Sequence, residues 1–325
     1  HSTNNRGYTN CLHNLAIAVI DQNPDEAECL FRKSIEIKEL VFGTDHLFTL
    51  LSVANLGNLL AKKGNFQEGE RLLQRAICGC ERLQHPYLGI FLGFLANALE
   101  NRGQYKDAEY YYRRALEMYE TIPGYYESSI NCNNNLAKLL CKKGDYAGAE
   151  TLFRRALAIC EKVLGNEHPN TARTLHNMGE LFHSMGDHGG AESHLSRALA
   201  IKEKVLGKEH LDTGASINSM ALLLKSKGNY VDAEMLSRRA LDICEKVLGK
   251  EHPDTIATRY NLAQLLRAKG DHKGAAPLYR QLIEIHEELL KKNISILPQI
   301  LNMFATGSNN LAFDTLVPEK NWKDA

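Results

Sequence analysis

The chain has 325 residues, of which 44% are hydrophobic and 24% charged, and its 39 basic and 39 acidic residues give a formal net charge of zero. This composition is that of a folded protein and excludes an intrinsically disordered chain. The balanced charge argues against a general nucleic-acid binder, which carries a basic excess. No apolar run reaches the ~18 residues of a membrane-spanning helix, so we predict no membrane insertion.

The ends of the chain and its cysteines indicate its context. The first residues, His1 to Arg6, contain neither an initiator methionine nor an apolar signal segment, so we interpret the sequence as a fragment of a longer protein. The eight cysteines are scattered and do not stand in the paired spacings of a small disulfide-rich protein. They favour a reduced, cytoplasmic protein.

Internal repeats organise most of the chain. The string Lys-Val-Leu-Gly-x-Glu-His occurs at 162–168, 204–210 and 246–252, in steps of 42 residues. A second marker, a glycine before a polar residue and then an aromatic residue or histidine, begins at Gly64, Gly103, Gly144, Gly186, Gly228 and Gly270. Such a fixed period is typical of a repeat architecture. We predict seven units in a single array over 1–292, at about 8–42, 43–84, 85–123, 124–165, 166–207, 208–249 and 250–292.

Each unit is predicted to contain two helices. In the unit at 166–207, Leu175, Met178 and Phe182 follow a spacing of three and four, which predicts one helix over 171–185 and a second over 190–206. A glycine follows each helix, as a stop signal. No segment alternates with period two, so we predict no sheet. The predicted fold is all-α, a right-handed α-solenoid of about seven helix-turn-helix repeats.

Small residues recur where the two helices of a unit must approach each other. Because a larger side chain at such a position would push the helices apart, the recurrence predicts tight contacts. The positions are Gly57, Ala96, Ala137, Gly179, Ala221 and Ala263 in the first helices and Ala108, Ala149, Ala191, Ala233 and Ala275 in the second.

The repeated residues resemble a known family. From Asn135 the chain reads Asn-Leu-Ala-x-Leu-Leu-x-x-x-Gly-Asp-Tyr-x-x-Ala-Glu, and from Arg154 it reads Arg-Arg-Ala-Leu-Ala-Ile-Cys-Glu-Lys-Val-Leu-Gly-x-Glu-His-Pro. This pattern resembles the tetratricopeptide repeat, in the 42-residue form found in kinesin light chains and nephrocystin-3. The resemblance implies stacked helix pairs whose concave face binds a partner protein, with asparagines that hold the backbone of the bound segment.

Asparagine recurs on the predicted concave face. Helical spacing places the residues 13, 10, 9, 6, 3 and 2 positions before each marker glycine on this face, which we call the groove face. Asparagine lowers helix propensity, but its amide offers donors and an acceptor to an extended peptide. The alternative interpretation is that these side chains cap or bridge neighbouring helices. The candidate binding residues are Asn55, Asn58, Asn97, Asn134, Asn135, Asn177, Asn218 and Asn261.

Basic residues outnumber acidic residues on the groove face. A concave surface focuses such a field, so we predict an acidic peptide ligand. The alternative is that these are ordinary solvated lysines and arginines of helix surfaces. The basic residues are Lys62, Lys138, Lys142, Arg173, Lys225 and Arg267, against Glu100 and Glu180, and all of the basic residues except Lys62 are candidate binding residues.

The histidines and cysteines predict no metal site. His176 and His183 are seven residues apart, more than ~10 Å along a helix, which is too far for one ion. Cys78 and Cys80 lack a second pair of ligands. The histidines between the units recur too regularly to be ligands and are predicted to begin the next helix; they are His46, His85, His168, His210 and His252.

The sequence carries no recognisable catalytic or nucleotide-binding motif, so we predict a protein that is not an enzyme and needs no cofactor. We expect an interaction scaffold similar to a cargo adaptor, which binds a protein or peptide and not nucleic acid. The alternative is the regulatory or sensor array of a larger switch protein, which binds within its own chain or mediates oligomerisation. The sequence does not define the oligomeric state. Residues 293–325 are predicted to form a capping helix and a C-terminal tail.

Overall fold

The computed structural model describes residues 2–20, 22–121, 124–291 and 303, and these residues contain fourteen α-helices and no strand. The prediction of an all-α repeat array is therefore confirmed. The chain divides into two compact parts between Val163 and Leu164. The predicted capping helix and tail at 293–325 lie outside the described residues, apart from Met303.

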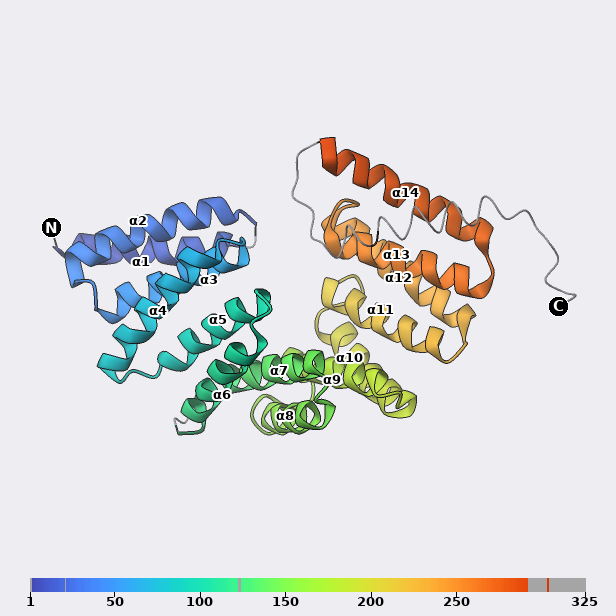
Figure 1. Ribbon diagram of the computed structural model, residues 1–325, viewed down its shortest axis with the longest axis horizontal. Helices are drawn as coiled ribbons and strands as arrows, with labels where there is room; N and C mark the ends of the chain where they lie inside the picture. The colour runs from blue at the N-terminus through green and yellow to red at the C-terminus, as the bar shows by residue number, and fades with distance from the viewer. Residues whose placement is uncertain (1, 21, 122–123, 292–302, 304–325) are drawn as a thin grey trace, which may run out of the picture. The chain divides into compact units, whose positions relative to one another are not determined.

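Consecutive helices pack side by side as pairs (Figure 1). The first part contains α1 (Ser2–Val19), α2 (Pro24–Phe42), α3 (Leu47–Lys62), α4 (Phe66–Leu83), α5 (Leu88–Asn101), α6 (Tyr105–Thr121), α7 (Tyr126–Lys143) and α8 (Tyr146–Ile159). A π-helical turn, Cys160–Leu164, follows α8. The second part contains α9 (Pro169–Ser184), α10 (His188–Val205), α11 (Leu211–Ser226), α12 (Tyr230–Leu248), α13 (Pro253–Lys269) and α14 (His272–Lys291). The first helix begins at Ser2, earlier than the predicted unit boundary at residue 8.

In the four pairs from α7–α8 to α13–α14, the turn between the helices is set by two residues, the marker glycine and the aspartate or asparagine after it. The marker glycine adopts a positive φ, for example 83° at Gly144, where a side chain would be strained. The next residue then caps the second helix, because the Asp145 carboxylate accepts a hydrogen bond of 2.9 Å from the backbone N–H of Gly148. The glycine and the capping residue together end one helix and begin the next.

Four of the five recurring histidines cap the first helix of the next pair, as predicted, whereas His85 accepts a hydrogen bond from the backbone N–H of Tyr87, the residue before α5. Nδ1 of His168 accepts a hydrogen bond of 3.1 Å from the backbone N–H of Asn170. Thr171 fixes the same loop by donating from Oγ1 to the backbone oxygen of Gly165 at 2.8 Å. Equivalent histidine caps stand at His46, His210 and His252.

The small residues allow the helices of a pair to touch, as predicted. A Cβ atom added at Gly57 would lie 2.9 Å from the backbone oxygen of Gly69, and one at Gly179 would lie 2.5 Å from Cγ of Leu195. Ala191 is fully buried in the corresponding position of α10. No larger side chain fits at these contacts without a shift of the helices.

Within each of the two parts, ion pairs connect a helix pair to the preceding one. A basic residue at the end of a first helix reaches back to a glutamate of the preceding second helix, at 2.6 to 2.8 Å. The pairs are Lys63–Glu28, Arg102–Glu70, Lys227–Glu192 and Lys269–Glu234, and Lys143 and Glu109 form a further one. Each exposed pair contributes only ~0–1 kcal/mol to the free energy of unfolding. Together, however, these pairs neutralise many of the charged side chains on the surface.

Candidate functional site

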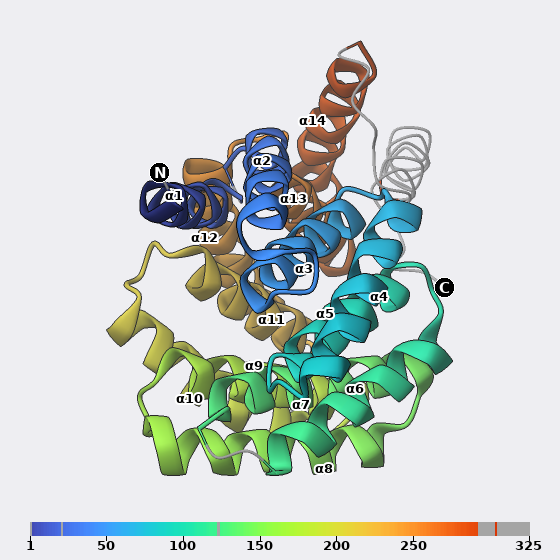
Figure 2. The ribbon, with the colours of Figure 1, turned by 90° about the vertical axis from the view of Figure 1, so that its left-hand side faces the viewer.

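A hollow of about 270 Å³ lies between α3 and α5 in the first part. The two helices contact each other and lie side by side in Figure 2. It is lined by Asn58, Ala61, Lys62, Phe94, Asn97, Ala98 and Asn101. All of these except Ala98 occupy groove-face positions, so the two candidate asparagines Asn58 and Asn97 come together there as helical spacing predicts. The hollow combines amides, one ammonium and one aromatic ring.

The amide of Asn97 is oriented by a buried tyrosine. Tyr112 of α6 is fully buried, and its hydroxyl donates a hydrogen bond of 2.5 Å to Oδ1 of Asn97. Burial and the nearby Glu100 carboxylate raise the pKa of Tyr112, which keeps this donor protonated. The same hydroxyl lies 3.1 Å from the Glu100 carboxylate. Since Tyr112 binds Oδ1 of Asn97, the N–H groups of this amide remain for a ligand. Asn97 therefore bridges two helices and also faces the hollow.

Two other asparagines of α3 present different groups. Nδ2 of Asn55 donates to the backbone oxygen of Leu51 at 2.9 Å, which leaves Oδ1 and the second N–H for a ligand. Asn58 is half-buried in the hollow, and it forms no hydrogen bond with any described residue. The amides thus offer donors and acceptors at defined places along one face.

The remaining candidate asparagines differ in exposure. Asn134 and Asn177 are 3% and 9% exposed, so their amides are mostly covered. Asn135 and Asn261 are partly exposed, and Oδ1 of Asn218 is buried without a hydrogen-bond partner. Helical spacing alone assigns all five to the groove face, but packing decides how much of each amide a ligand can reach.

The basic residues are not equally available. Lys142 forms an ion pair of 2.6 Å with Glu100, which offsets its charge. Lys138 is exposed and pairs with no described residue, and Lys225 is half-buried, which lowers its pKa. Arg173 is exposed and Arg267 half-buried, both in the second part. These basic residues therefore differ in how far a ligand can reach their charge.

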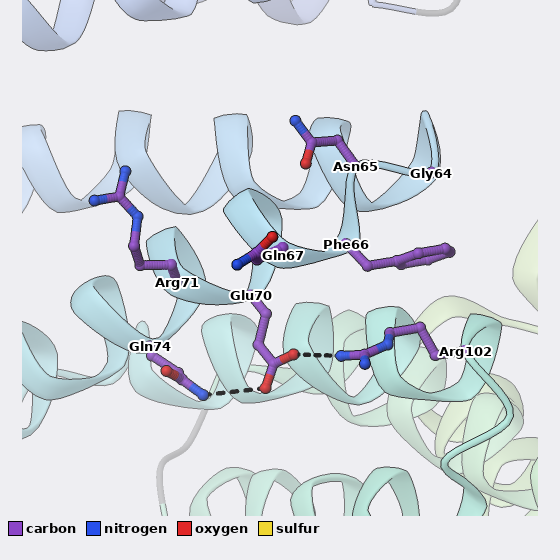
Figure 3. A pocket seen from close by; sticks show the side chains of 8 residues that line it. All are labelled: Gly64, Asn65, Phe66, Gln67, Glu70, Arg71, Gln74 and Arg102. Atoms are coloured by element: carbon purple, nitrogen blue, oxygen red, sulfur yellow. Dashed lines mark hydrogen bonds and ion pairs between the residues drawn. The ribbon is translucent and has the colours of Figure 1, made fainter.

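A second, larger hollow of about 680 Å³ lies at the start of α4 (Figure 3). Its central carboxylate, Glu70, accepts hydrogen bonds from Gln74 at 3.2 Å and from Arg102 at 2.7 Å. Phe66 and Arg71 point away from this pair in Figure 3. Because the polar groups at its centre already satisfy one another, this hollow is the weaker candidate for ligand binding.

Sequence reasoning missed two buried lysines. Lys38 of α2 and Lys202 of α10 are 2% and 5% exposed, and each donates a hydrogen bond to a buried serine. One signal in the sequence marks them. The repeats carry Ile-Cys-Glu at 159–161 and 243–245, whereas Ile-Lys-Glu stands at 37–39 and 201–203.

The fold and the amide-lined hollow together define an α-helical repeat array with a surface suited to binding an extended ligand. The tetratricopeptide repeat family matches residues 46–121, 129–204 and 212–288, and a second form of the repeat matches residues 9–47. These matches cover most of the chain, so the protein belongs to the tetratricopeptide repeat family.

Curated relatives share only part of the array. Tetratricopeptide repeat protein 19, mitochondrial, from Homo sapiens is 29% identical over 99 residues, which are 30% of this chain and 26% of that protein. The Rattus norvegicus protein of the same name is 28% identical over 95 residues, with 29% and 26% covered. The match thus spans about a quarter of the length of these relatives.

Solved structures share the fold. BtubC (BKLC) from P. vanneervenii has a TM-score of 0.62 at 21% identity, covering 72% of this chain and 94% of that one. The tetratricopeptide-like repeats of a candidate kinesin light chain from Podosopora anserina have a TM-score of 0.53 at 25% identity, covering 63% and 97%. A signal transduction ATPase from Pyrococcus horikoshii with a tetratricopeptide repeat sensor has a TM-score of 0.69 at 15% identity, covering 97% and 45%. The predicted likeness to kinesin light chain repeats is confirmed.

Within the part of the chain that the structure describes, no helix combines the length and the apolar character needed to cross a bilayer.

Proposed function

We propose that the chain is a non-enzymatic protein-interaction scaffold whose groove face binds an extended, acidic peptide segment of a partner protein. The hollow between α3 and α5 supports this proposal most directly, because Asn58, Asn97 and Lys62 converge there around a partly exposed ring, Phe94. Such a mixture of polar groups around an apolar surface is what an extended peptide needs for its backbone and side chains.

Each group in the hollow has a role in this proposal. The N–H groups of Asn97 donate to a backbone carbonyl of the peptide, and the free amide of Asn58 pairs with a neighbouring peptide group. The ring of Phe94 covers an apolar side chain, and the Lys62 ammonium attracts a carboxylate. Binding of the backbone by amides makes recognition depend little on sequence, while the cation adds the acidic preference.

The proposal also covers the partner class and the location of the protein. A net charge of zero favours a protein ligand over nucleic acid. None of the eight cysteines, all of which lie in the described part of the chain, forms a disulfide, which supports a reducing compartment such as the cytoplasm. The similar mammalian proteins are named as mitochondrial, so fractionation of cells that express the tagged parent protein would distinguish the two locations.

The experiment is selection on a peptide array with the wild-type chain, followed by calorimetric titration of the best peptides. Asn58→Ala combined with Asn97→Ala is expected to weaken binding by ~1–3 kcal/mol, about 5- to 150-fold, because two hydrogen bonds are lost. The control is Gln74→Ala, an exposed side chain of the second hollow. Equal affinity for the double variant, the control and the wild type would show that the peptide binds elsewhere.

A second candidate function is the sensor array of a larger switch protein. The likeness to the Pyrococcus horikoshii signal transduction ATPase covers 97% of this chain and supports this alternative at the level of fold. There the groove face would bind a segment of its own parent protein or of a second copy. Sedimentation of the isolated chain, with and without the remainder of the parent protein, tests this: a self-associating chain that selects no array peptide would favour the sensor function.

A further inference from the structure

In the second part, a series of hydrogen-bonded side chains connects a buried lysine to the groove face. Nζ of Lys202 donates to Oγ of Ser216 at 2.8 Å, and this oxygen lies 3.1 Å from Nδ1 of His176. On the other side of the ring, Nε2 of His176 lies 3.3 Å from Oε1 of Glu180, which also accepts a hydrogen bond of 3.0 Å from Ser219. The buried positive charge is thus linked through serine and histidine to a carboxylate on the groove face.

The first part contains the same chain of groups. Nζ of Lys38 donates to Oγ of Ser52 at 2.9 Å, and this oxygen lies 2.9 Å from Nδ1 of His13. Ser52 and Ser216 are both fully buried, and each lies six residues after a capping histidine. The ring of His13 is held from the side by an edge contact with Phe31. Two parts of one molecule therefore carry equivalent lysine, serine and histidine side chains.

The two series of hydrogen-bonded side chains differ in the residue that follows the histidine on the groove face. Glu180 stands four residues after His176, whereas Ile17 stands four residues after His13 and is 47% exposed. No described acidic side chain forms an ion pair or hydrogen bond with His13 or Lys38. The position of Ser219, which binds the Glu180 carboxylate, is occupied in α3 by Asn55, whose amide keeps one N–H free.

The protonation of His13 follows from this arrangement. Oγ of Ser52 accepts from the Lys38 ammonium, and its own hydroxyl proton has two acceptors within reach, Nδ1 of His13 at 2.9 Å and the backbone oxygen of Phe48 at 3.4 Å. We assign the proton to the shorter contact, with Nδ1 of His13. With this assignment the ring proton resides on Nε2, which forms no hydrogen bond or ion pair with a described residue. His13 thereby presents a fixed N–H donor, with a buried positive charge behind it, at the place where the second part holds a carboxylate.

We propose that His13 and Asn55 form a carboxylate-binding subsite, in which an aspartate or glutamate side chain of a bound protein segment takes the place that Glu180 takes in the second part. The inference rests on the proposed function in that the groove face receives the ligand. It adds where an acidic side chain binds and by which donors. An electrostatic argument supports the subsite: Lys38 is nearly fully buried without an anion, and a ligand carboxylate would compensate its charge.

The charges near the two buried lysines differ between the second part and the first. The pKa of Lys202 is lowered by burial. The carboxylates of Asp212 and Glu180 act in the opposite direction, and Arg173 adds to the lowering. The pKa of Lys38 is lowered to about 8 by burial alone. Carboxylates of this molecule thus act on the charge of Lys202, whereas the charge of Lys38 is left for the carboxylate of a partner to compensate.

The probe is N-acetyl-glutamate amide, which carries one side-chain carboxylate, and the control is N-acetyl-glutamine amide, which has the same shape without the charge. Both are titrated into the whole 325-residue chain while the imidazole nitrogens are followed by NMR, with His13→Gln to assign the His13 signals among the 13 histidines. We expect the acid to shift the Nε2 signal of His13 and raise its pKa, and the amide to leave both unchanged. An equal response to the two compounds would overturn the subsite.

An exchange between the two parts gives a second, independent test. Ile17→Glu places a carboxylate beside His13 and should weaken the probe about tenfold or more, because it occupies the donors and repels the ligand. Ile17→Gln is the neutral control and should retain most of the binding. Conversely, Glu180→Ile should make His176 respond to the acid. If Ile17→Glu leaves the His13 response intact, the proposal is wrong.

These outcomes are separable from failure of the proposed function. If array peptides bind the wild type, but bind Ile17→Glu and Ile17→Gln equally well, the groove face remains the binding surface and the subsite is overturned. If no array peptide binds, but the acid still shifts His13 and Ile17→Glu abolishes that shift, the subsite stands and the proposed peptide scaffold is overturned.

Discussion

At the scale of single residues, the half-buried ring of His13 makes stability depend on pH. Burial and the neighbouring Lys38 ammonium lower the pKa of His13 from 6.5 to about 4. Between these two values the unfolded chain binds more protons than the folded one, so His13 destabilises the fold progressively as the pH falls from 6.5 to 4. We expect a loss of ~1–2 kcal/mol from this group, a value reduced for its partial exposure to solvent.

Comparison with variants isolates this contribution from that of the carboxylates. His13→Gln retains an acceptor for Ser52 but does not titrate, so its free energy of unfolding should fall less steeply from pH 6.5 to pH 4 than that of the wild type. Urea unfolding at several pH values measures the difference, with the exposed His272→Gln as control. Parallel curves for His13→Gln and the wild type would mean that the ring titrates normally in the folded protein.

Buried charged residues are the part of the structure that could not be predicted from the sequence. The asparagines on one helical phase and the capping histidines were predictable, because each recurs at a fixed place in the repeat. Lys38 and Lys202 were not, since a lysine in an amphipathic helix is ordinarily a surface residue. Arg259, only 1% exposed and paired with Glu245 at 2.6 Å, was missed for the same reason. Their burial depends on partners in other helices.

At the scale of helices, substitution of a buried alanine tests the tight contact between the two helices of a pair. Ala191 in α10 is fully buried, whereas Ala200 in the same helix is exposed. Ala191→Leu should lower the free energy of unfolding by ~1–3 kcal/mol, because the added side chain forces the helices apart. Ala200→Leu changes the same atoms on the surface and should stay within ~0.5 kcal/mol of the wild type.

Chemical unfolding followed by circular dichroism measures both variants. Each should retain the helical spectrum of the wild type before the transition, because an all-α array can lose stability without changing its secondary structure. The same comparison can be made in α8 with Ala149→Leu and the exposed Ala158→Leu. Buried and surface variants of equal stability would contradict the tight helix contact.

Most of the helices followed from sequence because the start, stop and contact signals repeat. The marker glycines predicted where the first helix of a pair ends, and these glycines adopt a positive φ. The hydrogen bonds by which the following aspartate caps the second helix were not predicted. The π-helical turn at Cys160–Leu164 did not follow. It lies within one of the three copies of the Lys-Val-Leu-Gly motif, and the other two copies do not form such a turn, so the repeated residues alone do not determine it.

At the scale of the whole molecule, the charges fall into two groups. Many basic side chains are consumed in ion pairs between neighbouring helix pairs, and Lys142 is paired with Glu100 in the same way. Others, such as Lys62 and Lys138, remain exposed on the groove face without such a partner among the described residues. A net charge of zero is therefore compatible with a local positive surplus on the groove face, which stays a prediction from the sequence.

This division predicts how binding responds to charge and salt. Lys138→Glu combined with Arg173→Glu should weaken acidic array peptides about tenfold or more while affecting neutral peptides little, because the reversal acts through the local field. Lys106→Glu combined with Lys162→Glu changes the net charge by the same four units, from 0 to −4, at exposed positions away from the groove face. Wild-type affinity for acidic peptides should fall as salt rises, since partly exposed charges are screened over ~10 Å at 0.1 M. Titration of the same peptides at two salt concentrations checks all three expectations. If both double variants lose affinity equally, the effect belongs to the net charge, and the groove face has no special part in attracting the ligand.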